Sequence, residues 1–524
     1  MMRARSHSLS LIGLILLLLL SSGLKLVHLR ADAPRLFPNG FESSDPVKDE
    51  AAKSYEARNR ALFGAWVTSP ADDYRYWNTL SPAWTNSLWL WFKLCGVSYP
   101  ALRLFSVLWA ALGIFAVGRF FPAQKNALAG PLAAVLFAFN FYLLIYGRLG
   151  LMETALNTAL LGSVMLLVRA EDRPGLFPLA GLIFFFAYLI KQSAAAFLPV
   201  LALAALLAPS GRRRFGMITL AMVILALAAL FLWPDYWLRS VMNFRHALGW
   251  QPDASHRWLR FELPVTGRAL SQAFGFTGLV RGYWMMLPVA GPLALLEIII
   301  FLYRWAKTRS LDRTEALLVA WLLCARAALA FSPHAVVRFY LIQFPPVCLL
   351  AGLLLERILR TAAPGTHDFR GAADLRGAAD PSRAQRRLAV AALIVLSLIF
   401  DLLPFLGWLR SPSYQIRDAG QALHKALGPG PAVLIGEWAG PLCLESPDRT
   451  FYVKNIFNRR PEQLMQFGIT HLLYSDPDQD PAIKSFREAL PGPFEKRRLI
   501  LTLPLFNDKL SLFRVEVPQG SARP

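Results

Sequence analysis

Residues 9–28, LSLIGLILLLLLSSGLKLVH, contain the kind of apolar run that decides this fold. About 20 apolar residues in a helix, rising 1.5 Å each, cross the ~30 Å hydrocarbon core of a bilayer. Ten more runs follow, at 101–121, 127–147, 154–168, 176–190, 193–208, 215–233, 285–303, 315–331, 339–356 and 388–409. The sequence therefore predicts a polytopic α-helical membrane protein with eleven transmembrane helices, give or take about two, because some of the runs are short.

The composition supports the same class. Of the 524 residues, 55% are hydrophobic and 17% are charged, whereas soluble domains have about 45–50% apolar and about 25% charged residues. The net charge of +21 is unevenly distributed. With the N-terminus inside, the short loops on the cytoplasmic side carry 20 Lys and Arg residues, and those on the other side carry 3. This bias sets membrane topology, so the basic charge indicates orientation and contact with membrane lipid, and no nucleic-acid partner is expected.

This topology divides the chain into a membrane module and a soluble domain. The membrane module spans 1–409, and its first run is predicted to be an uncleaved anchor, with cleavage at Ala31-Asp32-Ala33 as the alternative. The C-terminal domain spans 410–524, lies outside and alternates helix-like with strand-like segments, which predicts a small α/β fold. The same topology predicts an external loop at 31–99, which contains amphipathic surface helices at 47–63 and 84–95. It also predicts a second external loop at 234–283 and a cytoplasmic linker at 357–387. Cys95 and Cys443 are both external, and the sequence leaves their pairing open.

Charged residues at the ends of membrane spans need an explanation, since a charge at the centre of such a helix costs about 2.5–3.5 kcal/mol. Four of them, Arg148, Glu153, Lys191 and Arg338, fall on the external side. The adjacent acids of the first loop, Asp49 and Glu50, fall on the same side. Snorkelling to the headgroups explains the basic residues without any function, and an ion pair with Arg148 would explain Glu153.

The functional alternative is a cavity at the external membrane face. Arg and Lys suit a phosphate because they supply charge-assisted donors, and a carboxylate suits deprotonation of an acceptor hydroxyl or amine. A sugar linked to a polyprenyl phosphate would bring its own membrane anchor and its own leaving group. Such a donor is consistent with the sequence, in which we find no glycine-rich loop for a nucleotide phosphate.

Several stretches carry a family resemblance. DEAAKSYEARNRALFGAW (49–66) and PAWTNSLWLWFKLCGVSYPALRLF (82–105) resemble the first external loop and second span of GT-C membrane glycosyltransferases. The most similar group contains the protein O-mannosyltransferases and the lipid A aminoarabinose transferase. YGRLGLMETALNTALL (146–161), FAYLIKQSAAAFLPV (186–200) and VVRFYLIQFPPVCLL (336–350) resemble later motifs of the same family in the same order.

The resemblance implies roles for individual residues. Asp49 falls on the catalytic base of the family, Glu50 on its acidic neighbour and Glu153 on a second acidic position. Arg148, Lys191 and Arg338 are expected to bind phosphate or to shape the site. The chain departs from the family pattern where a basic residue often stands close to the donor phosphate, since it has Ser81-Pro82-Ala83 there, and Lys53 is a candidate replacement for that charge.

Together these features predict a glycosyltransferase that moves a sugar from a polyprenyl-phosphate donor to a lipid, glycan or protein acceptor, with inversion. The charge bias predicts a cytoplasmic N-terminus and an external C-terminus, which in the bacterial cytoplasmic membrane of this hypothesis is periplasmic. No cofactor is required by this hypothesis, and a divalent metal at Asp49 or at the Asp72-Asp73 pair is an unsupported alternative. A transporter or flippase for a lipid-linked or anionic substrate and a non-catalytic envelope assembly protein are the other function classes.

Overall fold

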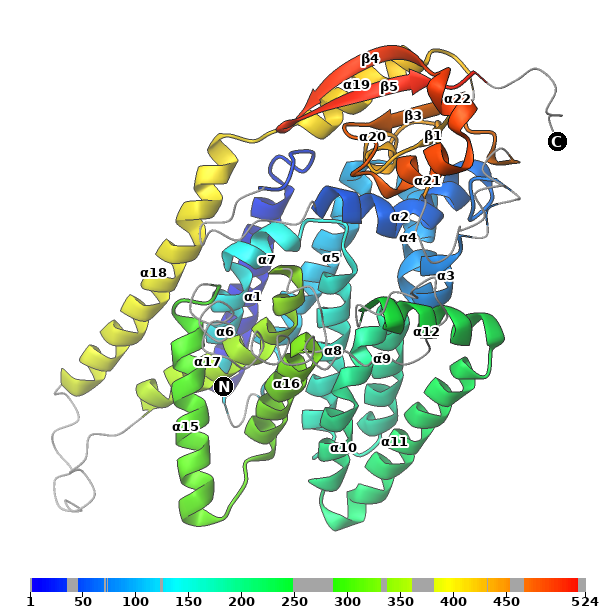
Figure 1. Ribbon diagram of the computed structural model, residues 1–524. Helices are drawn as coiled ribbons and strands as arrows, with labels where there is room; N and C mark the ends of the chain where they lie inside the picture. Colours follow the sequence, from blue (N-terminus) through cyan, green and yellow to red (C-terminus); the bar gives the residue numbers. More distant parts are fainter. Residues whose placement is uncertain are drawn as a thin grey trace, which may run out of the picture.

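The computed structural model describes residues 2–34, 46–69, 72, 74–122, 126–247, 286–330, 337–360, 381–430, 432–452 and 466–516. A helical bundle carries the C-terminal domain at one end (Figure 1). All eleven predicted apolar runs coincide with helices. The helices of the bundle are α1 (Met2–Leu26), α5 (Tyr99–Gly118), α6 (Ala129–Ala138), α7 (Phe141–Tyr146), α8 (Met152–Arg169), α9 (Leu176–Ile190), η1 (Gln192–Phe197), α10 (Leu198–Leu206), α11 (Ser210–Phe231), α15 (Ala290–Thr308), α16 (Arg313–Ala330), η3 (Val337–Gln343), α17 (Phe344–Arg360) and α18 (Pro381–Arg410).

Four described segments are long and apolar enough to cross a membrane, and they contain α5, α11, α17 and α18. The remaining apolar runs are shorter, or they are broken within the bundle. The run 127–147, for example, is broken at Asn140, whose side chain accepts hydrogen bonds from the first N–H groups of α7. Asp401 of α18 accepts further bonds from Asn140 Nδ2 (3.0 Å) and Phe141 N (3.1 Å). The chain is a membrane protein, and a count of eleven spans remains a prediction.

The segment predicted to be the first external loop forms a cap of three helices, α2 (Pro46–Phe63), α3 (Tyr76–Leu80) and α4 (Pro82–Cys95). The predicted helices at 47–63 and 84–95 are confirmed. The expectation that 47–63 is an amphipathic surface helix is wrong, because α2 is buried continuously from Glu50 to Asn59. In Figure 1 it lies between the bundle and the C-terminal domain, so both of its faces are covered. Helix α4 does have an exposed face, with Leu90 and Leu94 more than half exposed.

The C-terminal domain is the small α/β fold that the sequence predicts. Its five-stranded mixed sheet has the order β2-β1-β3-β5-β4, in which β1 is parallel to β2 and β3, and β5 is antiparallel to β3 and β4. The elements are α19 (Gln415–Leu427), β1 (Val433–Ile435), α20 (Ala439–Leu442), β2 (Arg449–Phe451), β3 (His471–Tyr474), α21 (Pro481–Ala489), α22 (Pro491–Glu495), β4 (Arg498–Leu505) and β5 (Asp508–Arg514). Most of a further expected helix, at 461–468, lies outside the described residues.

A buried arginine joins the cap to the C-terminal domain. Arg58 of α2 donates to the carbonyl oxygens of Leu444 (2.9 Å), Cys443 (2.6 Å), Ser446 (2.7 Å) and Asp448 (2.7 Å). A guanidinium can satisfy several carbonyls at once because it presents five donors in a rigid fork. The domain is thus held directly over α2. Cys443 is buried there as a free thiol, and Cys95 is a free exposed thiol, so the two do not pair.

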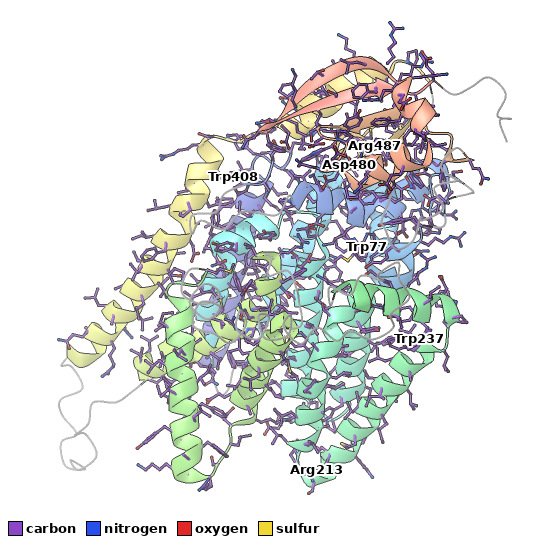
Figure 2. The ribbon with its side chains drawn as sticks, viewed as in Figure 1. Trp77, Arg213, Trp237, Trp408, Asp480 and Arg487 are labelled. Atoms are coloured by element: carbon purple, nitrogen blue, oxygen red, sulfur yellow. The ribbon has the colours of Figure 1, made fainter. Side chains whose placement is uncertain are left out.

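The other segments agree in part with their expected bounds. The predicted second external loop begins with α12 (Pro234–Ala247), and its remainder lies outside the described residues, as does 361–380 of the expected linker. Helices α17 and α18 extend into the predicted linker from both sides. Figure 2 places Arg213, one of the basic loop residues expected to be cytoplasmic, at the end of the bundle opposite Asp480 of the C-terminal domain.

Candidate active site

Helix α2 supplies two residues of the candidate site. Pro46 opens the helix and Asp49 lies in its first turn, where a carboxylate is favoured by the helix dipole. Lys53 follows four residues later, and this spacing puts both side chains on the same face of the helix. The side chain of Asp49 is 31% exposed and that of Lys53 is 6% exposed. The acid therefore faces the more open part of the site.

Glu153 lies at the start of α8, where its side chain is buried. Its Oε1 atom is 2.8 Å from Lys191 Nζ, 3.4 Å from Arg338 Nε and 3.5 Å from Lys53 Nζ. The Arg338 guanidinium also forms an ion pair with Asp49. Five predicted residues, from four separate segments, therefore form one cluster, which we call the charged cluster: Asp49, Lys53, Glu153, Lys191 and Arg338.

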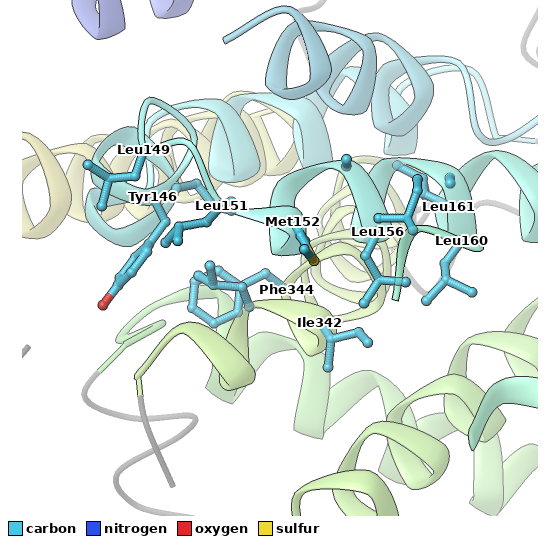
Figure 3. Close-up of a cluster of buried hydrophobic side chains, with 14 of the residues drawn as sticks. Tyr146, Leu149, Leu151, Met152, Leu156, Leu160, Leu161, Ile342 and Phe344 are labelled. Atoms are coloured by element: carbon cyan, nitrogen blue, oxygen red, sulfur yellow. The ribbon is translucent and has the colours of Figure 1, made fainter. Parts of the chain in front are cut away.

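Two 3-10 helices next to longer α-helices place two cations of the charged cluster. Lys191 follows the last residue of α9 in an extended conformation, and the 3-10 helix η1 begins directly after it. Arg338 is the second residue of η3, which leads into α17. Met152, Leu156, Ile342 and Phe344 belong to a packed apolar cluster between α8 and the segment formed by η3 and α17 (Figure 3).

The charged cluster has an excess of one positive charge, since three cations surround two carboxylates. Burial lowers the pKa of Lys53 to about 8, and Arg338 and Lys191 also lower it, while Glu153 and Asp49 oppose the change. In the described part of the chain, Glu153 is the one ionic partner of the Lys53 ammonium. The ammonium therefore has donors left for an anion. Such an excess of positive charge, partly shielded from water, favours a phosphate.

Glu50, predicted as a catalytic neighbour of Asp49, lies outside the charged cluster. Its carboxylate is fully buried and accepts two hydrogen bonds from Arg103, at Nε (3.0 Å) and Nη2 (2.8 Å), and one from Gly150 N (2.7 Å). Successive residues of a helix point about 100° apart, so the two adjacent acids face different surroundings. Glu50 thereby ties α2 to α5 and to the turn before α8.

Arg148, predicted to bind phosphate, is also occupied elsewhere. It donates to the carbonyl oxygens of Val27 (3.1 Å) and His28 at the end of α1, and its guanidinium stacks on Trp408 at 4.6 Å. Figure 2 shows Trp408 near the end of α18 that leads to the C-terminal domain. The alternative explanation of Glu153, an ion pair with Arg148, is wrong, because Glu153 pairs with Lys191, Lys53 and Arg338 instead.

Sequence reasoning missed two residues near these positions. Arg103, the partner of Glu50, was detectable as a charge inside the predicted span 101–121. Tyr452 of the C-terminal domain had no comparable signal. Its ring packs against Tyr55 of α2 with centroids 5.7 Å apart, and its pKa is raised by burial and by the neighbouring charge of Asp49. The C-terminal domain therefore lies over the candidate site close to Asp49.

The proposed metal alternatives find little support in the geometry. The described residues contain no group of three or more His, Cys, Asp or Glu side chains placed to hold a metal ion. Asp72 accepts a hydrogen bond from Tyr74 N (2.9 Å) and one from the Tyr55 hydroxyl (3.5 Å). Asp73 lies outside the described residues. At Asp49 and Glu153, the neighbouring cations already contact the carboxylates.

The arrangement of the helices is similar to that of solved glycosyltransferases, although no family model and no curated protein matches the sequence. ArnT from Cupriavidus metallidurans bound to undecaprenyl phosphate superposes with a TM-score of 0.59 at 14% identity, over 97% of both chains. The oligosaccharyltransferase AglB from Archaeoglobus fulgidus, in complex with an inhibitory peptide and a dolichol phosphate, gives 0.54 at 12% identity, over 88% of this chain and 69% of that chain.

A third structure, of the Archaeoglobus fulgidus oligosaccharyltransferase in complex with Zn and sulfate, gives a TM-score of 0.51 at 12% identity, over 88% of this chain and 67% of that chain. At such identities the likeness establishes the fold alone. The resemblance seen in the sequence motifs is thus confirmed at the level of architecture: this chain has the GT-C membrane glycosyltransferase fold.

Proposed function

We propose that this protein transfers a sugar from a polyprenyl-phosphate donor to an acceptor, with Asp49 as the base. The observation that carries the proposal is the charged cluster. Three cations from three segments meet at Glu153 Oε1, directly beside an accessible carboxylate. The fold adds support, since ArnT, with the same architecture, was solved with undecaprenyl phosphate bound.

The geometry distinguishes the two acids. The Glu153 side chain is 5% exposed and contacts Lys53, Lys191 and Arg338, so it is suited to hold the cations in place. The Asp49 side chain is 31% exposed and has Arg338 as its ionic partner in the described structure. A general base must come within hydrogen-bond distance of the acceptor. Of the two acids, Asp49 meets this requirement better.

The reaction is a single displacement at the anomeric carbon. The acceptor hydroxyl or amine gives its proton to Asp49 as its oxygen or nitrogen bonds to that carbon. The bond between the carbon and the phosphate oxygen breaks, and its electron pair stays on the polyprenyl phosphate. Arg338, Lys191 and Lys53 stabilise the negative charge that develops on the leaving phosphate. One displacement inverts the configuration of the sugar.

The acceptor approaches from the side of the C-terminal domain, according to this proposal. Tyr452 lies close to Asp49 from that domain, and Lys48 of α2 pairs with Glu437 (3.0 Å) across the same junction. A lipid, a glycan or a protein side chain would each present a suitable nucleophile. The active site would face the periplasm of a bacterial cytoplasmic membrane, with the N-terminus in the cytoplasm.

The test uses the purified full-length protein in detergent with a panel of radiolabelled polyprenyl-phosphate sugars. We expect release of sugar from at least one donor, by transfer or by slow hydrolysis. Asp49→Asn should abolish release while Asp418→Asn, an exposed aspartate on α19, retains it. Full turnover by a folded Asp49→Asn variant would refute the assigned base.

The same panel separates the other function classes. A transporter or flippase leaves every donor chemically intact, yet it moves one across the membrane of a proteoliposome. An assembly protein does neither, and its function is lost on deletion of 410–524 but not with Asp49→Asn. The GT-C fold supports the transferase over both.

A further inference from the structure

Two carboxylates at one site repel each other unless a cation lies between them. A divalent metal is one solution, and a solved structure with the same fold contains Zn and sulfate. Hard divalent cations such as Mg²⁺ bind carboxylate oxygens and then bind substrate phosphates. Asp49 and Glu153 either form such a metal site or have their negative charges balanced by neighbouring cationic side chains.

The donor set of the charged cluster does not fit a divalent metal. Glu153 Oε1 already contacts three cationic nitrogens, and Asp49 is paired with Arg338. A divalent ion would enter a region that already has an excess of positive charge, and it would have to displace an ammonium or a guanidinium. Zinc prefers thiolate and imidazole ligands, and the described part of the chain offers no cluster of them here.

The position of Lys53 is fixed by the fold of the cap. Its side chain is 6% exposed, and its backbone carbonyl accepts a hydrogen bond from Trp84 Nε1 of α4 (3.1 Å). The helix α2 on which it lies is buried on both faces. The ammonium therefore cannot swing out to water as a surface lysine does. Lys53 thus supplies a fixed positive charge beside Glu153, as a bound metal ion would, and Arg338 contacts both acids.

We propose that the Lys53 ammonium, supported by Arg338, takes the place of a divalent cation between the acids and the donor phosphate, so that this chain binds lipid phosphate without a metal. This inference rests on the proposed function.

The experiment measures binding of undecaprenyl phosphate to the full-length protein in detergent, with undecaprenol as the control for the tail alone. Binding is measured with excess EDTA and with excess Mn²⁺, and free Mn²⁺ is followed separately by its electron paramagnetic resonance signal. The variants are Lys53→Gln, Lys53→Arg and the matched control Lys48→Gln, whose lysine lies on the same helix but pairs with Glu437. Apparent melting temperatures verify that each variant is folded.

We expect the wild type to bind undecaprenyl phosphate equally with EDTA and with Mn²⁺, and to take up no stoichiometric Mn²⁺. Lys53→Gln should weaken binding about tenfold or more, as expected for one lost charge-assisted contact. Its binding should be partly restored by Mn²⁺, because loss of the ammonium removes both a contact of Glu153 and the excess positive charge that opposes the ion. Lys53→Arg should retain most of the affinity, and Lys48→Gln all of it.

Two results would overturn the inference while leaving the proposed function intact. One is loss of wild-type binding in EDTA. The other is one Mn²⁺ bound per wild-type chain and lost in Asp49→Asn. Both are measured without altering Lys53, so a Lys53 variant that fails to fold does not leave the question open. If the wild type binds undecaprenyl phosphate no better than undecaprenol, the proposed function itself fails.

Discussion

The buried pair between Glu50 and Arg103 offers a way to separate stability from catalysis in two adjacent acids. Glu50 is fully buried and Arg103 is 2% exposed. Their two hydrogen bonds, at 3.0 and 2.8 Å, form a bidentate pair, and Gly150 N adds a third bond at 2.7 Å. In Glu50→Gln the amide oxygen can still accept one hydrogen bond, but the NH₂ group is itself a donor and faces an N–H donor of Arg103. The buried guanidinium then loses its hydrogen-bonded counter-charge and is left with the weaker attraction of Asp32.

The size of the effect follows from this geometry. Breaking one partner of a buried pair destabilises a protein by about 3–5 kcal/mol, because the other charge stays buried without compensation. The entropy of unfolding is about 2.1 cal/mol/K per residue, or about 1.1 kcal/mol/K for this chain if it unfolds in one step. We therefore expect Glu50→Gln to lower the apparent melting temperature by about 3–5 °C. Asp49→Asn, at a partly exposed position, should lower it by less than about 1 °C.

The assay combines thermal unfolding followed by intrinsic fluorescence with sugar release per folded molecule. Glu50→Gln should be less stable yet retain sugar release at low temperature, and Asp49→Asn should show the reverse. Glu488→Gln, an exposed glutamate on α21, is the control for the substitution itself. Arg103→Met should destabilise as Glu50→Gln does, and the double variant should recover part of the loss. Unchanged stability with abolished release in Glu50→Gln would refute the structural role and return Glu50 to the chemistry.

Three further outcomes follow from the structure. Burial lowers the pKa of Lys53 to about 8. Arg338 and Lys191 add to this shift, and Glu153 and Asp49 oppose it. Affinity for undecaprenyl phosphate should therefore fall as pH rises through about 8, and Lys53→Arg should keep its affinity to higher pH. Arg148→Met removes the hydrogen bond that Arg148 donates to the chain at the end of α1 and the stacking contact with Trp408. It should lower the free energy of unfolding by about 1–3 kcal/mol and leave the affinity for lipid phosphate unchanged. A large loss of that affinity would restore the predicted phosphate-binding role of Arg148. Gly352→Ala would put a methyl carbon 2.3 Å from the Ala129 carbonyl oxygen, between α17 and α6, and should destabilise the protein by about 1–3 kcal/mol. The control Gly407→Ala on α18 places its methyl group where nothing lies within 4 Å, so it should leave stability unchanged or raise it by up to about 1 kcal/mol.

Much of the architecture could be predicted from the sequence because membrane helices and alternating strands have strong local signals. Each apolar run predicted a helix, since a segment in lipid must satisfy its own backbone hydrogen bonds. The α/β character of 410–524 also followed from local patterns. The break at Asn140 did not, because the run 127–147 is apolar on both sides of it, and the stabilising partner, Asp401, is 261 residues away.

The kind of site, a cluster of basic and acidic side chains, could be predicted from the sequence. Which of the charged residues belong to it could be predicted less well. Charge is costly near a membrane, so Glu153, Lys191 and Arg338 were visible as exceptions in apolar sequence, and their order resembled that of a family. Lys53 was visible as a departure from that family. The roles of Glu50 and Arg148 were not, because charge and position along the chain are the same for a catalytic group and for a structural ion pair.

What the sequence determined by itself was therefore the class of protein, the eleven apolar helical runs and the set of charges that had to be explained. Only the tertiary structure decided which charges meet. Asp49 and Glu50 are neighbours in sequence, yet the turn of one helix directs one toward Arg338 and the other toward Arg103. The physical reason is that an ion pair depends on distances of about 3–4 Å, and in a folded bundle those distances are set by packing between helices far apart in the chain.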